Sequence, residues 1–261
     1  THTFLVPPQF SAILSLENVQ KDIFSSLRTI LSAGSPLRLD VKENILSSIS
    51  ENLFELYGFS EGFATMLKPC DQRKKFGSVG TPVLGFEIKI IDEEGKECSP
   101  NVAGEIAGYG AGMMKEYYSE VELTKNLIWT DNRGRSFIKS GDIGSLDEDG
   151  FLTILDRKKD MIISGGLNVF PVDIEEIVGK HPDVMDVTVI GVPHEKWGET
   201  CLALIIPKDG VEINCDEIKS WCNEKLAKHQ RLYQVETREE FPRNALGKVL
   251  KRVLREPYWS Q

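Results

Sequence analysis

Several polar side chains of this 261-residue chain stand beside glycines, in patterns that suit the binding of an anionic ligand. Lys248 follows Gly247 directly, so a glycine turn presents a flexible ammonium group that can reach a negative centre. Residues 57–61, Tyr-Gly-Phe-Ser-Glu, follow a predicted strand and place a glycine turn, a hydroxyl and a carboxylate at its carboxyl end. Open α/β sheets bind their ligands at that end of their strands. The two segments therefore predict a ligand site.

Each segment, taken alone, also fits a plain structural role. Residues 57–61 would more often be a strand that ends in an ordinary turn with a solvated acid. Residues 33–37, Ala-Gly-Ser-Pro-Leu, read as a turn, and Asp156 with Arg157 as a weak surface ion pair. The functional interpretation therefore depends on a pattern that joins the segments.

Two longer runs supply that pattern. Residues 150–171, GFLTILDRKKDMIISGGLNVFP, and residues 241–251, FPRNALGKVLK, together resemble the C-terminal signature of the adenylate-forming superfamily, which comprises acyl-CoA synthetases, luciferases and peptide-synthetase adenylation domains. Residues 57–61, 33–37 and 140–142 are similar to its YGxTE, GGAPL and TGD motifs. The glycine pair in ISGGLNVFP resembles the acyl-CoA synthetase branch. The resemblance implies an enzyme that activates a carboxylate with ATP and transfers the acyl group to coenzyme A.

The resemblance also implies a set of nucleotide contacts. Tyr57 would stack on adenine, and Asp142 would accept hydrogen bonds from both ribose hydroxyls. Ser60, which stands where the superfamily usually has threonine, would contact phosphate. Arg157 would assist at the ribose or the phosphate. The full predicted set is Gly34, Ser35, Pro36, Tyr57, Gly58, Phe59, Ser60, Asp142 and Arg157.

The catalytic residues implied by the resemblance are Lys248 and Glu61. Attack of a carboxylate on the α-phosphate of ATP brings anions together, so Lys248 and a Mg²⁺ ion held by Glu61 would neutralise the charge that develops. Asp156 would be the hinge about which the C-terminal domain rotates. The residues that would line the pantetheine tunnel for coenzyme A are Ser164, Gly165 and Gly166.

The spacing of apolar residues predicts a mixed α/β chain. Helices are predicted over residues 17–31 and about 40–50, with a strand over 52–58. A helix is expected to open at Pro171, with another over about 214–228 and a last one after Lys248. The further predicted strands cover residues 86–92, 104–110, 137–146, 151–155, 187–192 and 201–207. Asp149-Gly150, between two of these strands, predicts a hairpin turn.

Three parts are expected along the chain. Residues 1–85 would be the distal part of a large layered α/β domain, residues 86–156 a small β-rich barrel, and residues 157–261 a mobile α+β C-terminal domain. The superfamily's phosphate loop, TSGTTGxPKG-like, has no match in the sequence. We therefore expect the chain to be the C-terminal half of such an enzyme, with the N-terminal half as a covalent or associated partner.

Composition narrows the remaining alternatives. A net charge of −9 argues against a nucleic-acid partner, and no apolar run approaches the length of a membrane-spanning helix. Five cysteines without C-x-x-C spacing favour the reducing cytoplasm. Two other functions stay open: a non-catalytic nucleotide-binding fragment or interaction module, and a luciferase-like oxidase of an adenylate. The identity of the acid cannot be read from the sequence.

Overall fold

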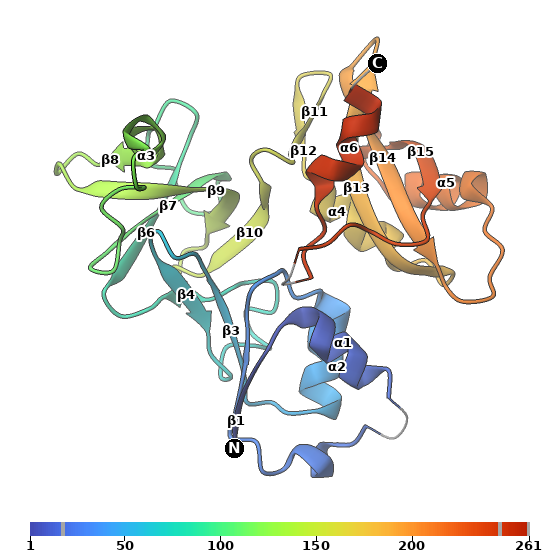
Figure 1. The fold of residues 1–261 in the computed structure, drawn as a ribbon, viewed down its shortest axis with the longest axis horizontal. Helices are drawn as coiled ribbons and strands as arrows, with labels where there is room; N and C mark the ends of the chain where they lie inside the picture. Colours follow the sequence, from blue (N-terminus) through green and yellow to red (C-terminus); the bar gives the residue numbers. More distant parts are fainter. Residues whose placement is uncertain (17–18, 245–246, 260–261) are drawn as a thin grey trace. The chain divides into compact units, whose positions relative to one another are not determined.

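The computed structural model describes residues 1–16, 19–244 and 247–259. The chain divides into two compact units, Thr1–Ile154 and Leu155–Gln261. Figure 1 shows helices and sheets in both, which confirms the predicted mixed α/β class. The finer division into three domains stays a prediction.

The first sheet of the first unit has the strand order β1-β2-β3-β4-β5. Strands β1, β2 and β3 run parallel, and β4 and β5 continue the sheet antiparallel. Helices α1 and α2 bury Phe10, Ile45 and Leu46 with the strand residues Ile30 and Leu53. The elements are β1 (His2–Leu5), α1 (Pro7–Leu14), η1 (Lys21–Phe24), β2 (Thr29–Ser32), α2 (Leu39–Ser48), β3 (Leu53–Gly58), β4 (Ala64–Leu67) and β5 (Thr81–Pro82).

The helix predicted over residues 17–31 is wrong. Its described part contains a short 3₁₀ helix and then strand β2. Phe24, at the end of the 3₁₀ helix, and Leu27, in the irregular segment that follows, do pack against the core, but no α-helix carries them. Ile30 then fills a strand position in the middle of the parallel pairing. Glu17 and Asn18, where the predicted helix begins, lie outside the described residues.

The second sheet of the first unit has the order β10-β9-β7-β6, with β8 beside β9, and it confirms the strands predicted after residue 85. The Asp149-Gly150 turn joins β9 to β10 as the sequence predicts, and Gly150 has φ +80°. The arrangement is a half-barrel. Its elements are β6 (Phe86–Ile91), β7 (Gly104–Gly110), α3 (Val121–Leu127), β8 (Ile128–Thr130), β9 (Ser136–Leu146) and β10 (Leu152–Arg157).

The second unit is built on a sheet of order β12-β11-β14-β13, with β15 parallel to β14. Alternate residues of β13 serve two cores: Val189 packs with α4 and α5, whereas Ile190 packs on the face that carries Leu254 of α6. The elements are β11 (Ile162–Ser164), β12 (Leu167–Val169), α4 (Pro171–Val178), β13 (Val184–His194), β14 (Gly198–Pro207), α5 (Cys215–Asn223), η2 (Lys228–Gln230), β15 (Leu232–Thr237) and α6 (Lys251–Trp259).

Most predicted elements of this unit are confirmed, with three differences. The short strands β11 and β12 were not predicted. The helix expected over 214–228 ends at Asn223, after Asn214 caps its first turn by accepting hydrogen bonds from the backbone of Asp216 and Glu217. Strand β15 was not predicted, because its alternation is weak and its partner β14 is distant in sequence.

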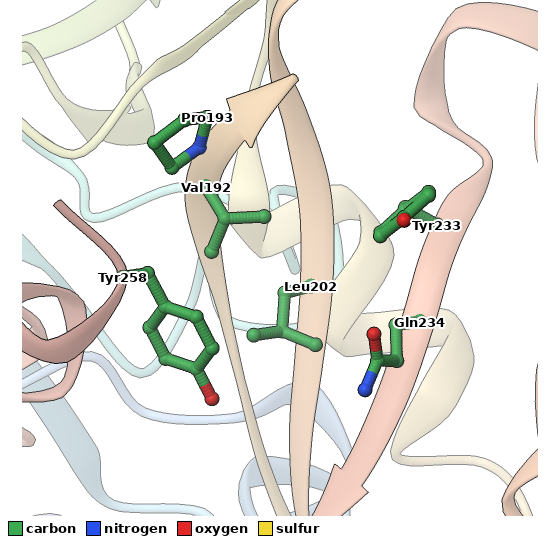
Figure 2. A pocket seen from close by; sticks show the side chains of 6 residues that line it. All are labelled: Val192, Pro193, Leu202, Tyr233, Gln234 and Tyr258. Atoms are coloured by element: carbon green, nitrogen blue, oxygen red, sulfur yellow. The ribbon is translucent and has the colours of Figure 1, made fainter. Parts of the chain in front are cut away.

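Two pockets lie away from the predicted site residues. Figure 2 shows the one in the second unit, about 310 Å³, where Val192 and Leu202 form a floor between Tyr258 of α6 and Tyr233 of β15. The other, about 400 Å³, surrounds Trp129 on the second sheet. Neither includes a residue predicted to bind nucleotide or coenzyme A.

All five cysteines are free thiols. Cys201 and Cys222 are buried, whereas Cys70 is exposed rather than a buried apolar residue. Among the helices that the structure describes, none is both long and apolar enough to cross a bilayer.

Candidate functional site

The turn after β2 and the turn after β3 lie at the same edge of the first sheet. The two strands are parallel neighbours, with Ser32 opposite Glu55, so their carboxyl ends point the same way. Residues 33–37 follow β2, and residues 59–61 follow β3. Gly34 has φ +95°, a conformation that a residue with a Cβ rarely adopts. The fold therefore brings together the two turns that the sequence predicts for the nucleotide.

The turn after β3 requires glycine at its first position. A Cβ on Gly58 would lie 2.4 Å from the carbonyl oxygen of Phe63. That carbonyl accepts a hydrogen bond from the backbone of Phe59, and the Phe59 and Phe63 rings pack edge to face at 5.1 Å. Ser60 and Glu61 are thereby held on a tight turn.

Asp142 is placed by a bulge in β9. Between the pairs Glu105–Ile143 and Ala107–Lys139 the two strands lose their register, so β9 has extra residues opposite Ile106. Gly141 within the bulge has φ +71°.

Ser140 stabilises the same bulge. Its hydroxyl donates to the Ile106 carbonyl at 3.0 Å and accepts from the Asp142 backbone at 3.0 Å. These bonds fix the backbone from which the Asp142 side chain projects.

The carboxylate of Asp142 meets the first sheet at Tyr57. The Tyr57 hydroxyl donates to Asp142 Oδ2 at 2.7 Å, across 85 residues of sequence. Asp142 is only 6% exposed. The predicted adenine and ribose residues are therefore neighbours in the folded chain, as a single nucleoside would require.

Glu61 is held by an aromatic residue that the sequence did not single out. The Tyr117 hydroxyl donates to Glu61 Oε1 at 2.7 Å, and this bond, together with burial, raises the pKa of Tyr117. The backbone of Met114 also donates to the Glu61 carbonyl, at 2.9 Å.

The surroundings of Glu61 suit a Mg²⁺ ion that is shared with water and substrate phosphates better than a metal ion whose ligands all come from the protein. In the described part of the chain, acidic, histidine and cysteine side chains form no cluster of three or more that could hold a metal ion. Mg²⁺ is commonly bound through one or two carboxylates together with water and substrate phosphates. A single well-anchored carboxylate at the nucleotide edge fits that mode of binding.

Gly165 and Gly166 form the two-residue turn of the β11–β12 hairpin. Their φ angles are +59° and +81°, as a tight hairpin turn of this kind requires. The Gly165 backbone donates to the carbonyl of Trp197 at 2.8 Å, and a Cβ at Gly165 would lie 2.9 Å from the Trp197 ring. A Cβ at Gly166 would meet open space. The turn thus exposes backbone without side chains, and the indole ring of Trp197 lies against it at Gly165.

Lys248 lies on a short loop that closes on itself. Asn244 accepts from the Lys248 backbone at 2.9 Å through its side chain, and its own backbone donates to the Lys248 carbonyl at 2.9 Å. Arg243 donates to the Gly247 carbonyl at 2.6 Å and pairs with Asp186 of β13. Ala245 and Leu246 of this predicted motif lie outside the described residues.

The two turns of the second unit lie at opposite ends of its sheet. The glycine hairpin joins β14 through the pair Ser164–Gly198, and Gly198 is opposite His194 on β13. The lysine loop is tied to β13 at Asp186. Eight strand residues separate those points, or roughly 26 Å at about 3.3 Å per residue.

Asp156 belongs to the second unit and caps a helix there. Its carboxylate accepts from the backbone of Arg157 at 2.6 Å and from Val172 in the first turn of α4 at 3.3 Å. Burial raises the pKa of Asp156 to about 6, although the Lys251 ammonium acts to lower it. Lys251 itself lies 2.8 Å from Glu175. Arg157 is half-buried beside this cap, and its role toward a nucleotide stays a prediction.

Comparison with known proteins gives the chain a family. The sequence profile described as "AMP-binding enzyme" matches residues 1–118, and the one described as "AMP-binding enzyme C-terminal domain" matches residues 173–248. The chain belongs to the AMP-binding enzyme family. The predicted resemblance is thereby confirmed.

Curated members of the AMP-binding enzyme family align with nearly all of this chain. A long-chain-fatty-acid–CoA ligase of Salmonella typhimurium is 35% identical over 248 residues, which are 95% of this chain and 43% of the ligase. An indoleacetate–CoA ligase of Aromatoleum aromaticum is 31% identical over 256 residues, 96% of this chain and 48% of the relative. The chain thus spans somewhat less than half the length of these relatives.

Solved structures of the family agree with the fold. ATP-bound MatB from Rhodopseudomonas palustris is 31% identical with a TM-score of 0.91, covering 99% of this chain and 51% of MatB. The o-succinylbenzoate CoA synthetase of Bacillus subtilis, in complex with its acyl-adenylate intermediate, is 32% identical with a TM-score of 0.83, covering 97% and 50%. Two relatives thus contain a nucleotide or an adenylate on a similar fold.

Sequence reasoning missed Tyr117 and Trp197 in this AMP-binding enzyme chain. Both contact predicted site residues, Glu61 and Gly165 respectively. The signal available in the sequence for Trp197 was a large aromatic residue shortly after a predicted strand. In the structure its side chain is 45% exposed. Tyr117 carried no such signal, because its partner lies 56 residues away.

Proposed function

We propose that this chain carries the nucleotide, lysine and coenzyme A elements of an AMP-forming acyl-CoA synthetase. The reaction is activation of a carboxylic acid by ATP to an acyl-adenylate, followed by formation of the CoA thioester. The observation that carries the proposal is the 2.7 Å bond between Tyr57 and Asp142, which joins the adenine and ribose residues at the carboxyl end of the parallel strands.

Nucleotide binding is the role of the first unit. Asp142 offers two carboxylate oxygens to the ribose hydroxyls, and its bond to Tyr57 orients both side chains before the nucleotide arrives. The turns at Gly34 and Gly58 let backbone groups approach the base and the phosphates closely. Glu61, fixed by Tyr117, would hold a Mg²⁺ ion, which would neutralise phosphate charge.

Adenylation also needs a cation that arrives with the second unit. The acid, the α-phosphate and the departing pyrophosphate are all anionic, and Lys248 stabilises the charge that builds up between them. Its loop is braced by Asn244 and Arg243, so the lysine backbone keeps its shape when the unit moves.

Thioester formation uses the other end of the second unit. The bare backbone of Gly165 and Gly166 leaves room for pantetheine to reach the adenylate. Because this hairpin and Lys248 lie at opposite ends of one sheet, a single orientation cannot bring both to the same adenylate. The unit therefore turns between the half-reactions, with Asp156 as the hinge.

The substrates of the proposed enzyme are ATP, coenzyme A and a carboxylic acid. The relatives named above act on different acids by name, a long-chain fatty acid and indoleacetate, so the acid is left as a class. A protein partner of the chain is the N-terminal half of such an enzyme, covalent or associated. We assign the protein to the cytoplasm, with all five thiols free.

Calorimetric titration of the chain with AMP tests the nucleotide half of the proposal. Saturable binding that Asp142→Ala weakens is the expected result. An interaction module without a nucleotide site would give no heat of binding. The adenylation activity is then tested on the chain joined to the N-terminal half of a relative. The measurement is ATP–pyrophosphate exchange, which should depend on an added carboxylic acid.

A further inference from the structure

Four polar side chains are buried beneath the nucleotide edge of the first unit. Lys42, Ser32 and Gln72 are each 1% exposed, and Glu55 is 8% exposed. Lys42 belongs to α2, whose other buried residues, Ile45 and Leu46, are apolar. Lysine and glutamate are almost never buried so fully unless they are paired, and an apolar pair of similar volume would often be as stable.

Lys42 connects three segments of the unit. Its ammonium lies 3.0 Å from Glu55 Oε2 on β3 and donates to the carbonyl oxygen of Phe76 at 2.6 Å. The same ammonium lies 5.2 Å from the centre of the Phe76 ring. One side chain thus ties helix α2 to strand β3 and to the segment that leads into residues 77–80.

Three buried side-chain oxygens of these four residues are incompletely satisfied. Within the described residues, Ser32 Oγ, Glu55 Oε2 and Gln72 Oε1 accept or donate no well-directed hydrogen bond. Ser32 and Glu55 are direct partners on adjacent strands, and Gln72 donates to the Leu53 carbonyl on β3 at 3.1 Å. Burial raises the pKa of Glu55, although Lys42 acts to lower it. Burying polar groups without complete hydrogen bonds destabilises the fold, so we infer that this cluster has a role beyond packing.

Ser32, Lys42 and Glu55 belong to the three elements next to the turn of residues 33–37 and to Tyr57. Ser32 is the last residue of β2 before the turn of residues 33–37. Helix α2, which carries Lys42, begins directly after that turn. Glu55 precedes Tyr57 on the same strand. The turn is therefore anchored at both of its ends to the strand that carries Tyr57.

We propose that the buried Lys42–Glu55 pair is a positioning device for the nucleotide, which holds the turn of residues 33–37 at a fixed distance from Tyr57 without touching the ligand. This inference rests on the proposed function, because it needs a nucleotide at that edge. Charge fixes the separation of α2 and β3 more narrowly than apolar packing does, since the ammonium must satisfy both Glu55 and the Phe76 carbonyl.

The test compares AMP affinity with thermal stability in the full chain. Lys42→Met together with Glu55→Leu removes both charges and keeps similar volumes. We expect a thermal midpoint close to that of the parent and an AMP affinity lower by about tenfold, the effect of roughly 1.4 kcal/mol of lost orientation. Glu87→Gln is the matched control, because it breaks the 2.6 Å ion pair with Arg135 on the second sheet. It should lower the midpoint and leave AMP affinity unchanged.

The outcomes separate this inference from the proposed function. A parent chain that does not bind AMP overturns both. A parent that binds AMP, with a double variant of equal affinity, overturns only the positioning role. Should the double variant not fold, Glu55→Gln, which keeps the shape of the side chain, replaces it. Unchanged AMP affinity in Glu55→Gln would likewise overturn the positioning role.

Discussion

The nucleotide edge of the first unit and the turns of the second unit place their functional groups in different ways. Tyr57 and Asp142 meet across 85 residues, with Asp142 buried. Lys248 and Gly166 instead sit on turns that are closed by bonds to near neighbours in sequence. Each turn has a further contact that the structure describes, with Asp186 or with Trp197. Recognition of a bound nucleotide needs a fixed geometry, which long-range contacts supply. Groups that act one after another need only keep their local shape while the whole unit moves.

The largest expected effect is the loss of Lys248. In an enzyme that contains this chain and an N-terminal half, Lys248→Ala should slow adenylation by about 10²–10³-fold, or roughly 3 to 4 kcal/mol, because charge on the reacting phosphates is left without its cation. Pyrophosphate exchange measures this step. Conversion of a preformed adenylate to thioester should survive, and the exposed Lys180→Ala should leave both steps intact. Equal damage to both half-reactions would contradict the separate use of the two turns.

The next largest effect is expected for Asp156→Asn, which should change the free energy of unfolding in a pH-dependent way. Burial raises its pKa from 3.8 to about 6, so the folded chain binds this proton more tightly than the unfolded chain does. Its stabilising contribution is complete below pH 3.8 and is lost as the pH rises to about 6. Asp156→Asn should therefore raise the free energy of unfolding at pH 7 by up to about 3 kcal/mol.

Urea unfolding of Asp156→Asn and of the parent between pH 4 and pH 7 checks this expectation. The difference between the two proteins should grow with pH and level off above about pH 6. The exposed Asp209→Asn is the control. A constant difference at every pH would mean that the cap of α4 does not titrate in this range.

At the nucleotide edge, Asp142→Ala should weaken AMP binding by about 1.5 to 3 kcal/mol, because a charged acceptor of the ribose is lost. Tyr57→Phe removes only the hydroxyl that orients this carboxylate, and should cost about 0.5 to 1.5 kcal/mol. Calorimetry with AMP measures both. Binding that is indifferent to Asp142 would remove the ribose assignment and, with it, the contrast between the two units.

The smallest effect concerns the glycine hairpin. Gly166→Val should adenylate normally but transfer to CoA about tenfold more slowly, because a branched side chain narrows the approach of pantetheine. Part of any effect is backbone strain, since Gly166 has φ +81°. Gly210→Val is a matched control: its φ is +75° and a Cβ there also meets open space. Equal loss of transfer in both variants would assign the effect to strain alone.

The sequence predicted best those features that are local. The hairpin signal at Asp149-Gly150 and the helix start at Pro171 are both confirmed. The prediction of a helix over residues 17–31 was wrong because its apolar residues fit the spacing of a helix as well as that of a turn followed by a strand. Ile30 is buried in a parallel ladder, and that ladder depends on strands far away in sequence.

Contacts of the candidate site could be predicted only through the family motifs. Nothing around Tyr57 indicates that its hydroxyl reaches Asp142, because a bulge 85 residues later decides it. Lys42 reads in sequence as a solvated residue of an amphipathic helix, and only the fold shows that it is buried. The roles assigned to the site residues stay predictions.

The bulge in β9 also limits how this sequence can change in length. Side chains alternate between the two faces of a strand, so losing one residue from the bulge would turn every residue on one side of it to the opposite face. Phe137 and Ile138, now fully buried, lie on the near side of the bulge, and the buried Ile143 lies beyond it. A substitution in this strand affects one contact, but a single-residue deletion would turn every side chain on one side of the bulge to the opposite face of the sheet. Descendants of this gene should therefore keep the length of β9 even where its residues differ.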